Sequence, residues 1–213
     1  NYIIRRTKKA DDLPPKIRHE HWVDLTQQQK EFYNMRYKIR KQRILDVVRG
    51  GANLDQQRKS ILGAIQDLKQ ICNFDPEEFS SNKILLLKQI IKKAIDCNEK
   101  VIVFSQFLPF GINKIKAALI NDNFSCLELI GEMSSQERDY NIELFKTDNK
   151  YNIFLCSLKA GGVGLNLEEA SVVIHFDHWW NPALMWQAED RAHRFGQTKT
   201  VKVHSFWTKN TID

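Results

Sequence analysis

The sequence predicts an α/β fold in which a parallel β-sheet is flanked by helices, preceded by a helical appendage. In the later part of the chain, short apolar runs rich in β-branched residues alternate with segments of helical periodicity, which is typical of βαβ units. Hydrophobic residues make up 42% and charged residues 27% of the 213 positions, so a real core is expected. We divide the chain into a connector and helical protrusion at 1–80 and an α/β domain at 81–213.

The first elements follow from turn and cap residues. Pro14 and Pro15 exclude a helix and favour an extended connector. A strand is predicted at 19–25. The chain then has helical periodicity to about Cys72, with a break at Gly50-Gly51.

The elements of the α/β domain alternate regularly. Ser134-x-x-Glu137 is a capping-box pattern that opens a helix. The other helices are predicted from apolar residues at helical spacing. Helices are predicted around 84–94, 112–119 and 134–145, and strands at 101–104, 126–130, 152–156, 172–176 and 201–206. Because such strands have apolar residues on both faces, the sheet is expected to be parallel and buried.

Charge and cysteine content restrict the class of protein. The first 60 residues hold 15 Lys and Arg against 7 Asp and Glu, and the remainder holds 17 against 19. A basic first segment points to a polyanionic partner, although solubilising charge on exposed helices explains it equally well. The four cysteines form no CxxC pair, so neither a zinc site nor a disulfide framework is predicted, and a reducing intracellular compartment is expected. The sequence shows neither a membrane span nor a signal-peptide pattern.

Polar and glycine residues follow the predicted strands, at the edge where parallel sheets bind ligands. Glycines there allow backbone N–H groups to face a phosphate, although an ordinary βα turn is the alternative. A Gly-x-x-x-x-Gly-Lys-Ser/Thr loop and an Asp-Glu-x-His motif are both missing from the sequence. The residues concerned are Ser105, Gln106, Ser157, Lys159, Gly161, Gly164, Asn166, Asp177 and His178.

A helix is predicted from Asn181-Pro182 to Gly196, with an N-cap, a proline at the first position and a glycine after the end. On that helix Gln187, Arg191 and Arg194 share one face, with Leu184, Ala188 and Ala192 on the packed side. Two guanidiniums on one face suit a multiply charged oxyanion, whereas a solvated basic face is the alternative.

The histidines and tryptophans of this region have simpler explanations. A metal site at His175, His178 and His193 is not predicted, because suitable Cys or carboxylate spacing is missing. Trp179-Trp180 could stack on bases, but large aromatic residues are more often core or interface anchors.

Together these stretches resemble the second motor lobe of Swi/Snf-type ATPases, a branch of the superfamily 2 helicases. Val101-Ile-Val-Phe-Ser-Gln-Phe107 is similar to motif IV, the stretch from Leu155 to Leu167 to motif V, and Trp180-Asn-Pro with the stretch from Gln187 to Gln197 to motif VI. The resemblance covers nearly the whole chain. It departs at Phe195, where isoleucine is common, and at Asn73-Phe-Asp, which replaces Asn-His-Pro.

The resemblance implies a RecA-like lobe of the P-loop NTPase superfamily that closes on a first lobe, with ATP in the cleft. ATP and Mg²⁺ would be held mainly by the first lobe. The expected roles are arginine fingers for Arg191 and Arg194; nucleotide binding for Gln187, Gly164 and Asn166; and contacts to the phosphates of one DNA strand for Ser105, Gln106, Ser157, Lys159 and Gly161.

The implied function is movement on double-stranded DNA, driven by ATP hydrolysis, with remodelling of protein–DNA complexes. Without the P-loop this lobe alone is expected to be inactive. The resemblance also implies that the domain is cut short at its C-terminus, at 211–213. The location would be the cytoplasm or nucleoid of a prokaryote, or the nucleus of a eukaryote. A non-enzymatic DNA-binding or adaptor module is the alternative. A dinucleotide or nucleotide-sugar enzyme is disfavoured, because Leu-Pro-Phe follows Val101–Phe107 where a glycine fingerprint would be needed.

Overall fold

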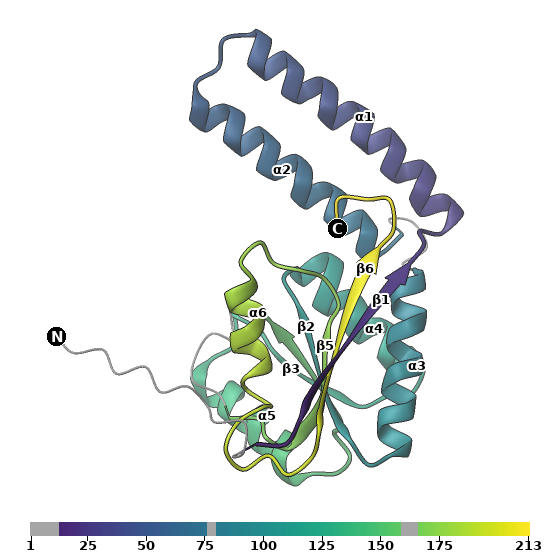
Figure 1. Ribbon diagram of the computed structural model, residues 1–213, viewed down its shortest axis with the longest axis vertical. Coiled ribbons are helices and arrows are strands. Elements are labelled where there is room, and N and C mark those ends of the chain that lie inside the picture. Colours follow the sequence, from purple (N-terminus) through teal and green to yellow (C-terminus); the bar gives the residue numbers. More distant parts are fainter. Residues whose placement is uncertain (1–12, 76–79, 159–165) are drawn as a thin grey trace, which may run out of the picture.

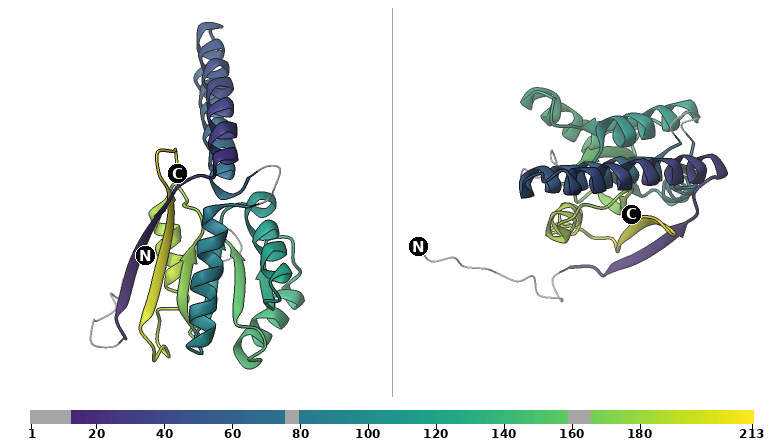
Figure 2. Two further views of the ribbon diagram at one scale, coloured as in Figure 1. Left: turned by 90° about the vertical axis from the view of Figure 1, so that its right-hand side faces the viewer. Right: turned by 90° about the horizontal axis from the view of Figure 1, so that it is seen from above.

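The computed structural model describes residues 13–75, 80–158 and 166–213. A six-stranded, all-parallel sheet has helices on both faces, and a long helical hairpin projects from one end (Figures 1 and 2). The strand order is β1-β6-β5-β2-β4-β3. The strands are β1 (Lys16–Val23), β2 (Lys100–Ser105), β3 (Cys126–Leu129), β4 (Ile153–Ser157), β5 (Ala170–His175) and β6 (Val201–Thr208). The predicted fold class is confirmed.

The sheet separates two apolar layers, as expected of a parallel sheet buried on both faces. One layer packs β2, β4 and β5 against α3 (Asn82–Asp96) and α4 (Asn113–Asn121), the latter continuing a π-helical turn, η2 (Leu108–Ile112). The other layer packs the opposite side of the same strands against α5 (Ser135–Thr147) and α6 (Pro182–Glu189). Alternate residues of β2 show the division, because Val103 belongs to the first layer and Ile102 to the second.

The helical hairpin consists of α1 (Gln27–Arg49) and α2 (Leu54–Asn73). Each helix begins with a capping box, in which the cap residue and the residue three positions later exchange hydrogen bonds,. The predicted break between the helices is confirmed, and Gly51 there has a φ of 71°, a conformation that favours glycine. Near its base the hairpin has a small core that includes Tyr33, Leu68 and Ile71.

Strand β1 brings the N-terminal segment into the sheet. It begins three residues before the predicted strand, at Lys16, and pairs with β6 over its whole length, from Lys16 opposite Val201 to Val23 opposite Thr208. The sheet therefore takes one edge strand from the segment assigned to the connector and protrusion. The domain boundary at residue 80 stays a prediction.

Candidate nucleotide and nucleic-acid site

The loops that follow β2, β4 and β5 meet at one end of the sheet. The Leu158 amide donates to the Ser105 carbonyl oxygen at 3.1 Å, and the Phe176 amide donates to the Phe104 carbonyl oxygen at 3.0 Å. These backbone bonds hold the three loops side by side. The polar residues that follow the strands therefore form one site, as the ligand edge of an α/β sheet requires.

Asp177, the second residue after β5, is at the centre of this site. Its carboxylate is fully buried and accepts hydrogen bonds from the Ser105 hydroxyl, from the Gln106 amide at 2.9 Å and from Asn73 Nδ2 at 2.9 Å. Burial raises the pKa of Asp177, although these hydrogen bonds and the charge of Lys83 act in the opposite direction,. Because one carboxylate serves three donors, it fixes the loop after β2 relative to β5 and to the end of α2.

A second set of bonds connects the base of the hairpin to the same loops. Lys69 Nζ and Gln106 Nε2 donate to the His178 carbonyl oxygen at 3.0 and 2.8 Å. Asn73 Nδ2 also donates to the Phe110 carbonyl oxygen at 3.1 Å. Lys69 and Asn73 are buried, so the end of α2 is part of the site's framework rather than a loosely attached appendage.

The prediction of one helix from Asn181 to Gly196 is wrong. Helix α6 begins after Asn181 as expected but ends at Glu189, so Arg191 and Arg194 do not lie on it and do not share a helical face with Gln187. The cause is competition for backbone carbonyls. The Arg191 carbonyl oxygen accepts from the Leu167 amide at 3.1 Å, and in a continued helix it would accept from the residue four positions later.

Side chains hold the segment after α6 in its non-helical path. Gln197 Nε2 donates to the carbonyl oxygens of Glu168, Ala170 and Ala192 at 2.9, 2.8 and 3.1 Å. A ring nitrogen of His193 lies 2.8 Å from the Pro14 carbonyl oxygen. The bonds to Glu168, Ala170 and Pro14 therefore replace the last helical turns with tertiary contacts.

Glu189 anchors the end of α6 to the edge strand β1. Its side chain is 1% exposed and accepts from both terminal nitrogens of Arg18 at 2.8 and 2.6 Å and from Lys16 at 3.1 Å. Burial alone would raise the pKa of Glu189, but interactions with His175, Arg18 and Lys16 lower it to about 2. The carboxylate is therefore charged, and it orients the segment that carries the two arginines.

Arg191 lies near Cys156 of β4, and Arg194 lies close enough to Arg191 to act on its charge. Arg191 is buried and Arg194 is half-buried. Burial lowers the pKa of Arg191 and the charge of Arg194 lowers it further, whereas Cys156 and Asp190 raise it. Guanidiniums stay ionised at neutral pH, so the segment after α6 holds two positive charges near each other. Such an arrangement is chemically suited to a polyphosphate.

The other predicted site residues lie in different environments. The Ser105 hydroxyl is buried and bonded to Asp177, Gln106 is half-buried, Ser157 is buried and Gln187 is exposed. The Asn166 side-chain oxygen is buried and accepts no hydrogen bond from the described part of the chain. Lys159, Gly161 and Gly164 lie outside the described residues. The roles assigned to all of these residues stay predictions.

Trp179 packs against the second apolar layer, whereas Trp180 is 47% exposed and lies beside Lys69. The His178 ring stacks on Trp207 at a centroid distance of 3.5 Å, and His175 lies 3.5 Å from Glu189. Over the described ranges, no three His, Cys, Asp or Glu side chains gather as metal ligands. Within the same ranges no helix is long and apolar enough to cross a bilayer.

Sequence reasoning missed four residues of this framework, namely Lys69, Asn73, Asp177 in its central role, and Glu189. A carboxylate directly after the buried run Val172–Phe176 was the available signal for Asp177. For Lys69, Asn73 and Glu189 the sequence holds no comparable signal, because their partners are far away in the chain.

Comparison with protein families gives two matches. Residues 82–196 match the helicase conserved C-terminal domain, and residues 1–77 match the SNF2-related domain. An uncharacterized ATP-dependent helicase of Mycoplasma genitalium is 37% identical over 100% of this chain and 21% of its own length. An ISWI chromatin-remodeling complex ATPase of Arabidopsis thaliana is 33% identical over 100% of this chain and 21% of its own length. The chain therefore spans about a fifth of the length of the curated relatives it matches.

A solved structure gives the same result. The chain is similar to the Sulfolobus solfataricus SWI2/SNF2 ATPase core in complex with dsDNA, with a TM-score of 0.76 and 31% identity. The match covers 93% of this chain and 42% of that one, so the similarity is to one part of that core.

Proposed function

Because the chain belongs to the helicase C-terminal domain family, as a Swi2/Snf2-type RecA-like lobe, we propose that it is the second motor lobe of a DNA-dependent ATPase that moves along double-stranded DNA. ATP would bind between this lobe and a first RecA-like lobe of the same polypeptide. That first lobe would supply the phosphate-binding loop and most of the Mg²⁺ ligands. By itself the present lobe would not hydrolyse ATP.

The pair Arg191 and Arg194 carries this proposal. Two guanidiniums held near each other, one of them buried, suit a multiply charged anion, because each offers forked donors to its oxygens,. Charge that develops on a transferring phosphoryl group is such an anion, and preorganised guanidiniums stabilise it without reorganisation during the reaction. We assign both residues the role of arginine fingers, which can contribute 10³ to 10⁵ in rate. Gln187, Gly164 and Asn166 would contact the nucleotide.

Double-stranded DNA is the proposed track. Ser105, Gln106, Ser157, Lys159 and Gly161 would contact phosphates of one strand, and such contacts position a protein without reading sequence. The similar archaeal core was solved with dsDNA, which supports this choice. Because the Ser105 hydroxyl is bonded to Asp177, Ser105 would also fix the shape of the loop that meets the phosphates.

Remodelling of protein–DNA complexes is the proposed outcome of this movement. The Arabidopsis relative is named as part of a chromatin-remodeling complex, and a motor that tracks duplex DNA would displace proteins bound ahead of it. The substrate complex would be chosen by parts of the polypeptide other than this lobe.

ATP hydrolysis by the full-length polypeptide tests the proposal. We would measure turnover with and without a 30-base-pair duplex for the wild type, Arg191→Ala and Arg194→Ala, with the exposed Arg49→Ala as control. Duplex-stimulated turnover that falls roughly 10³-fold or more in the first two variants, with DNA binding retained and Arg49→Ala unaffected, is expected. Unchanged turnover in both variants contradicts the assignment of the arginines. A wild type that binds duplex but shows no turnover supports a non-enzymatic DNA-binding module instead.

A further inference from the structure

The helical hairpin carries the net charge of the protein. Residues 27–73, which form α1, α2 and their loop, contain ten Lys and Arg and four Asp and Glu. The difference is +6, which equals the net charge of the whole chain. The hairpin also projects away from the α/β domain as a rod (Figures 1 and 2). The charge is therefore concentrated on an element whose base contacts the proposed motor site and whose tip projects away from it.

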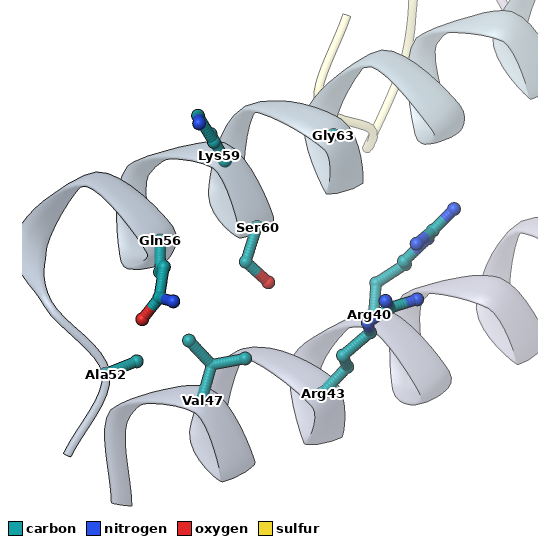
Figure 3. Close-up of a pocket in the computed structure, with 8 residues that line it drawn as sticks. All are labelled: Arg40, Arg43, Val47, Ala52, Gln56, Lys59, Ser60 and Gly63. Atoms are coloured by element: carbon teal, nitrogen blue, oxygen red, sulfur yellow. The ribbon is translucent and has the colours of Figure 1, made fainter. Parts of the chain in front are cut away.

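A hollow of about 540 Å³ lies between α1 and α2, toward the tip of the hairpin. Figure 3 shows that Gln56 and Ser60 of α2 face Arg43 and Val47 of α1 across it. Three of the eight lining residues are cations and none is acidic; the eight are Arg40, Arg43, Val47, Ala52, Gln56, Lys59, Ser60 and Gly63. Cations, an amide and a hydroxyl can all donate hydrogen bonds, and phosphate oxygens accept them.

The cations differ in how far their charge is neutralised. Toward the base of the hairpin, Asp67 accepts from Arg36 at 3.3 Å and from Arg40 Nε at 2.9 Å. Toward the tip, Arg43 and Lys59 are exposed and form no hydrogen bond or ion pair with any residue in the described ranges. The hollow is therefore bordered by charge that the hairpin itself does not compensate.

We propose that this hollow binds the phosphodiester backbone of double-stranded DNA, as a second DNA contact outside the motor site. The choice of track rests on the proposed function. Arg43 and Lys59 pair with phosphates, and Ser60 and Gln56 add neutral hydrogen bonds. The contact reads no sequence, because it involves backbone phosphates only.

The lining favours a phosphate backbone over a segment of an acidic protein. Protein interfaces are usually anchored by buried aromatic or large apolar side chains. Here the apolar lining is limited to Val47, Ala52 and the backbone at Gly63. Affinity would come from charge neutralisation, so each phosphate contact contributes about 0.9 to the salt slope of binding.

The base of the hairpin connects such a contact to the motor. Lys69 and Asn73, at the other end of α2, are bonded to His178 and Asp177 in the proposed site. DNA held in the hollow would therefore be held at a fixed geometry relative to the loops after β2 and β5.

Fluorescence anisotropy of a labelled 30-base-pair duplex with the 213-residue chain tests the proposal at several salt concentrations. Arg43→Gln/Lys59→Gln removes both uncompensated cations of the hollow. Lys38→Gln/Arg58→Gln is the matched control, because both residues are exposed on the same helices and neither lines the hollow. A second variant keeps every existing contact: a Cβ at Gly63 meets nothing within 4 Å, so Gly63→Glu places a carboxylate at the hollow, with Gly63→Ala as control.

The expected result is roughly tenfold weaker duplex binding or more for Arg43→Gln/Lys59→Gln at low salt, with a slope of log K against log salt that falls by about 1.8 for two lost phosphate contacts. Gly63→Glu is expected to weaken binding as well, and both controls should change affinity less than about threefold. Equal weakening by the two double variants, or no weakening by either, overturns the proposal. The same measurement with labelled polyglutamate tests for an acidic protein partner. If Arg43→Gln/Lys59→Gln loses polyglutamate binding but keeps duplex binding unchanged, the proposal is overturned in favour of such a partner. Duplex-stimulated ATP hydrolysis by the full-length polypeptide reports separately on the motor, so either failure can be recognised.

Discussion

Replacement of Asp177 by alanine tests whether one buried carboxylate organises the proposed site. The substitution removes the acceptor of three donors, namely the Ser105 hydroxyl, the Gln106 amide and Asn73 Nδ2. Asn73 Nδ2 retains the Phe110 carbonyl oxygen as a partner. As a donor, the Ser105 hydroxyl keeps only a long bond of 3.4 Å to the Phe107 carbonyl oxygen, and the Gln106 amide loses its acceptor.

The magnitude follows from these two donors. A buried donor without a partner costs about 1–3 kcal/mol, so roughly 6 kcal/mol is the upper bound for two, and the weak bond left to Ser105 reduces it. Part of this is offset, because burial of the carboxylate is itself unfavourable and raises the pKa of Asp177. We expect a net loss of about 3 kcal/mol in the free energy of unfolding.

Urea unfolding followed by circular dichroism measures this loss. With a slope of about 1–3 kcal/mol per molar urea, Asp177→Ala should lower the midpoint by about 1 M or more. Asp122→Ala is the control, because it removes a carboxylate that is 45% exposed and paired with Lys88 on the surface, where an ion pair contributes at most about 1 kcal/mol. If both variants lose less than about 1 kcal/mol, the carboxylate does not organise the loops and the reasoning is refuted.

Three further results are expected. Urea unfolding at pH 7 should show Glu189→Gln less stable by up to about 3 kcal/mol. Because the folded pKa of Glu189 is lowered to about 2, the stability that its charge contributes is present above about pH 4.5 and is lost as the pH falls toward 2. The same dependence of stability on acid pH in the variant and the wild type would contradict this. The folded pKa of His204 is lowered to about 4, chiefly by burial, so its stabilising effect is present above about pH 6.5 and lost as the pH falls through 4; NMR titration of the ring should give a midpoint well below 6, and a normal midpoint would count against it. A Cβ at Gly111 would lie 2.2 Å from Ser105 Oγ, so Gly111→Ala should lower the free energy of unfolding by about 1–3 kcal/mol. The helical Gly63→Ala should raise it by about 0.5–1 kcal/mol. Thermal unfolding measures both, and equal effects would show that the close approach is unimportant.

Local signals predicted the sheet and hairpin correctly. Apolar runs such as Val101–Phe104 became central strands, and the break at Gly50-Gly51 became the hairpin loop. Such features depend on residues close together in the sequence. The prediction also placed the polar residues after β2, β4 and β5 at one edge, because parallel strands require it.

The path of the segment after α6 was not predictable in this way. Its caps and spacing favoured a helix to Gly196, but Arg191 and Gln197 form backbone and side-chain bonds with residues 167–170. Such long-range contacts override local helix propensity. The same reason hides the role of Glu189, whose partners Lys16 and Arg18 lie more than 170 positions away.

Triplex displacement tests the central claim, movement along double-stranded DNA, most directly. The full-length polypeptide would be loaded on a duplex that carries a labelled third strand, and release of that strand would be followed with ATP. The account predicts ATP-dependent release by the wild type, and none by Arg191→Ala or Arg194→Ala despite retained duplex binding. Hydrolysis of ATP by the wild type without release of the third strand would contradict movement along DNA.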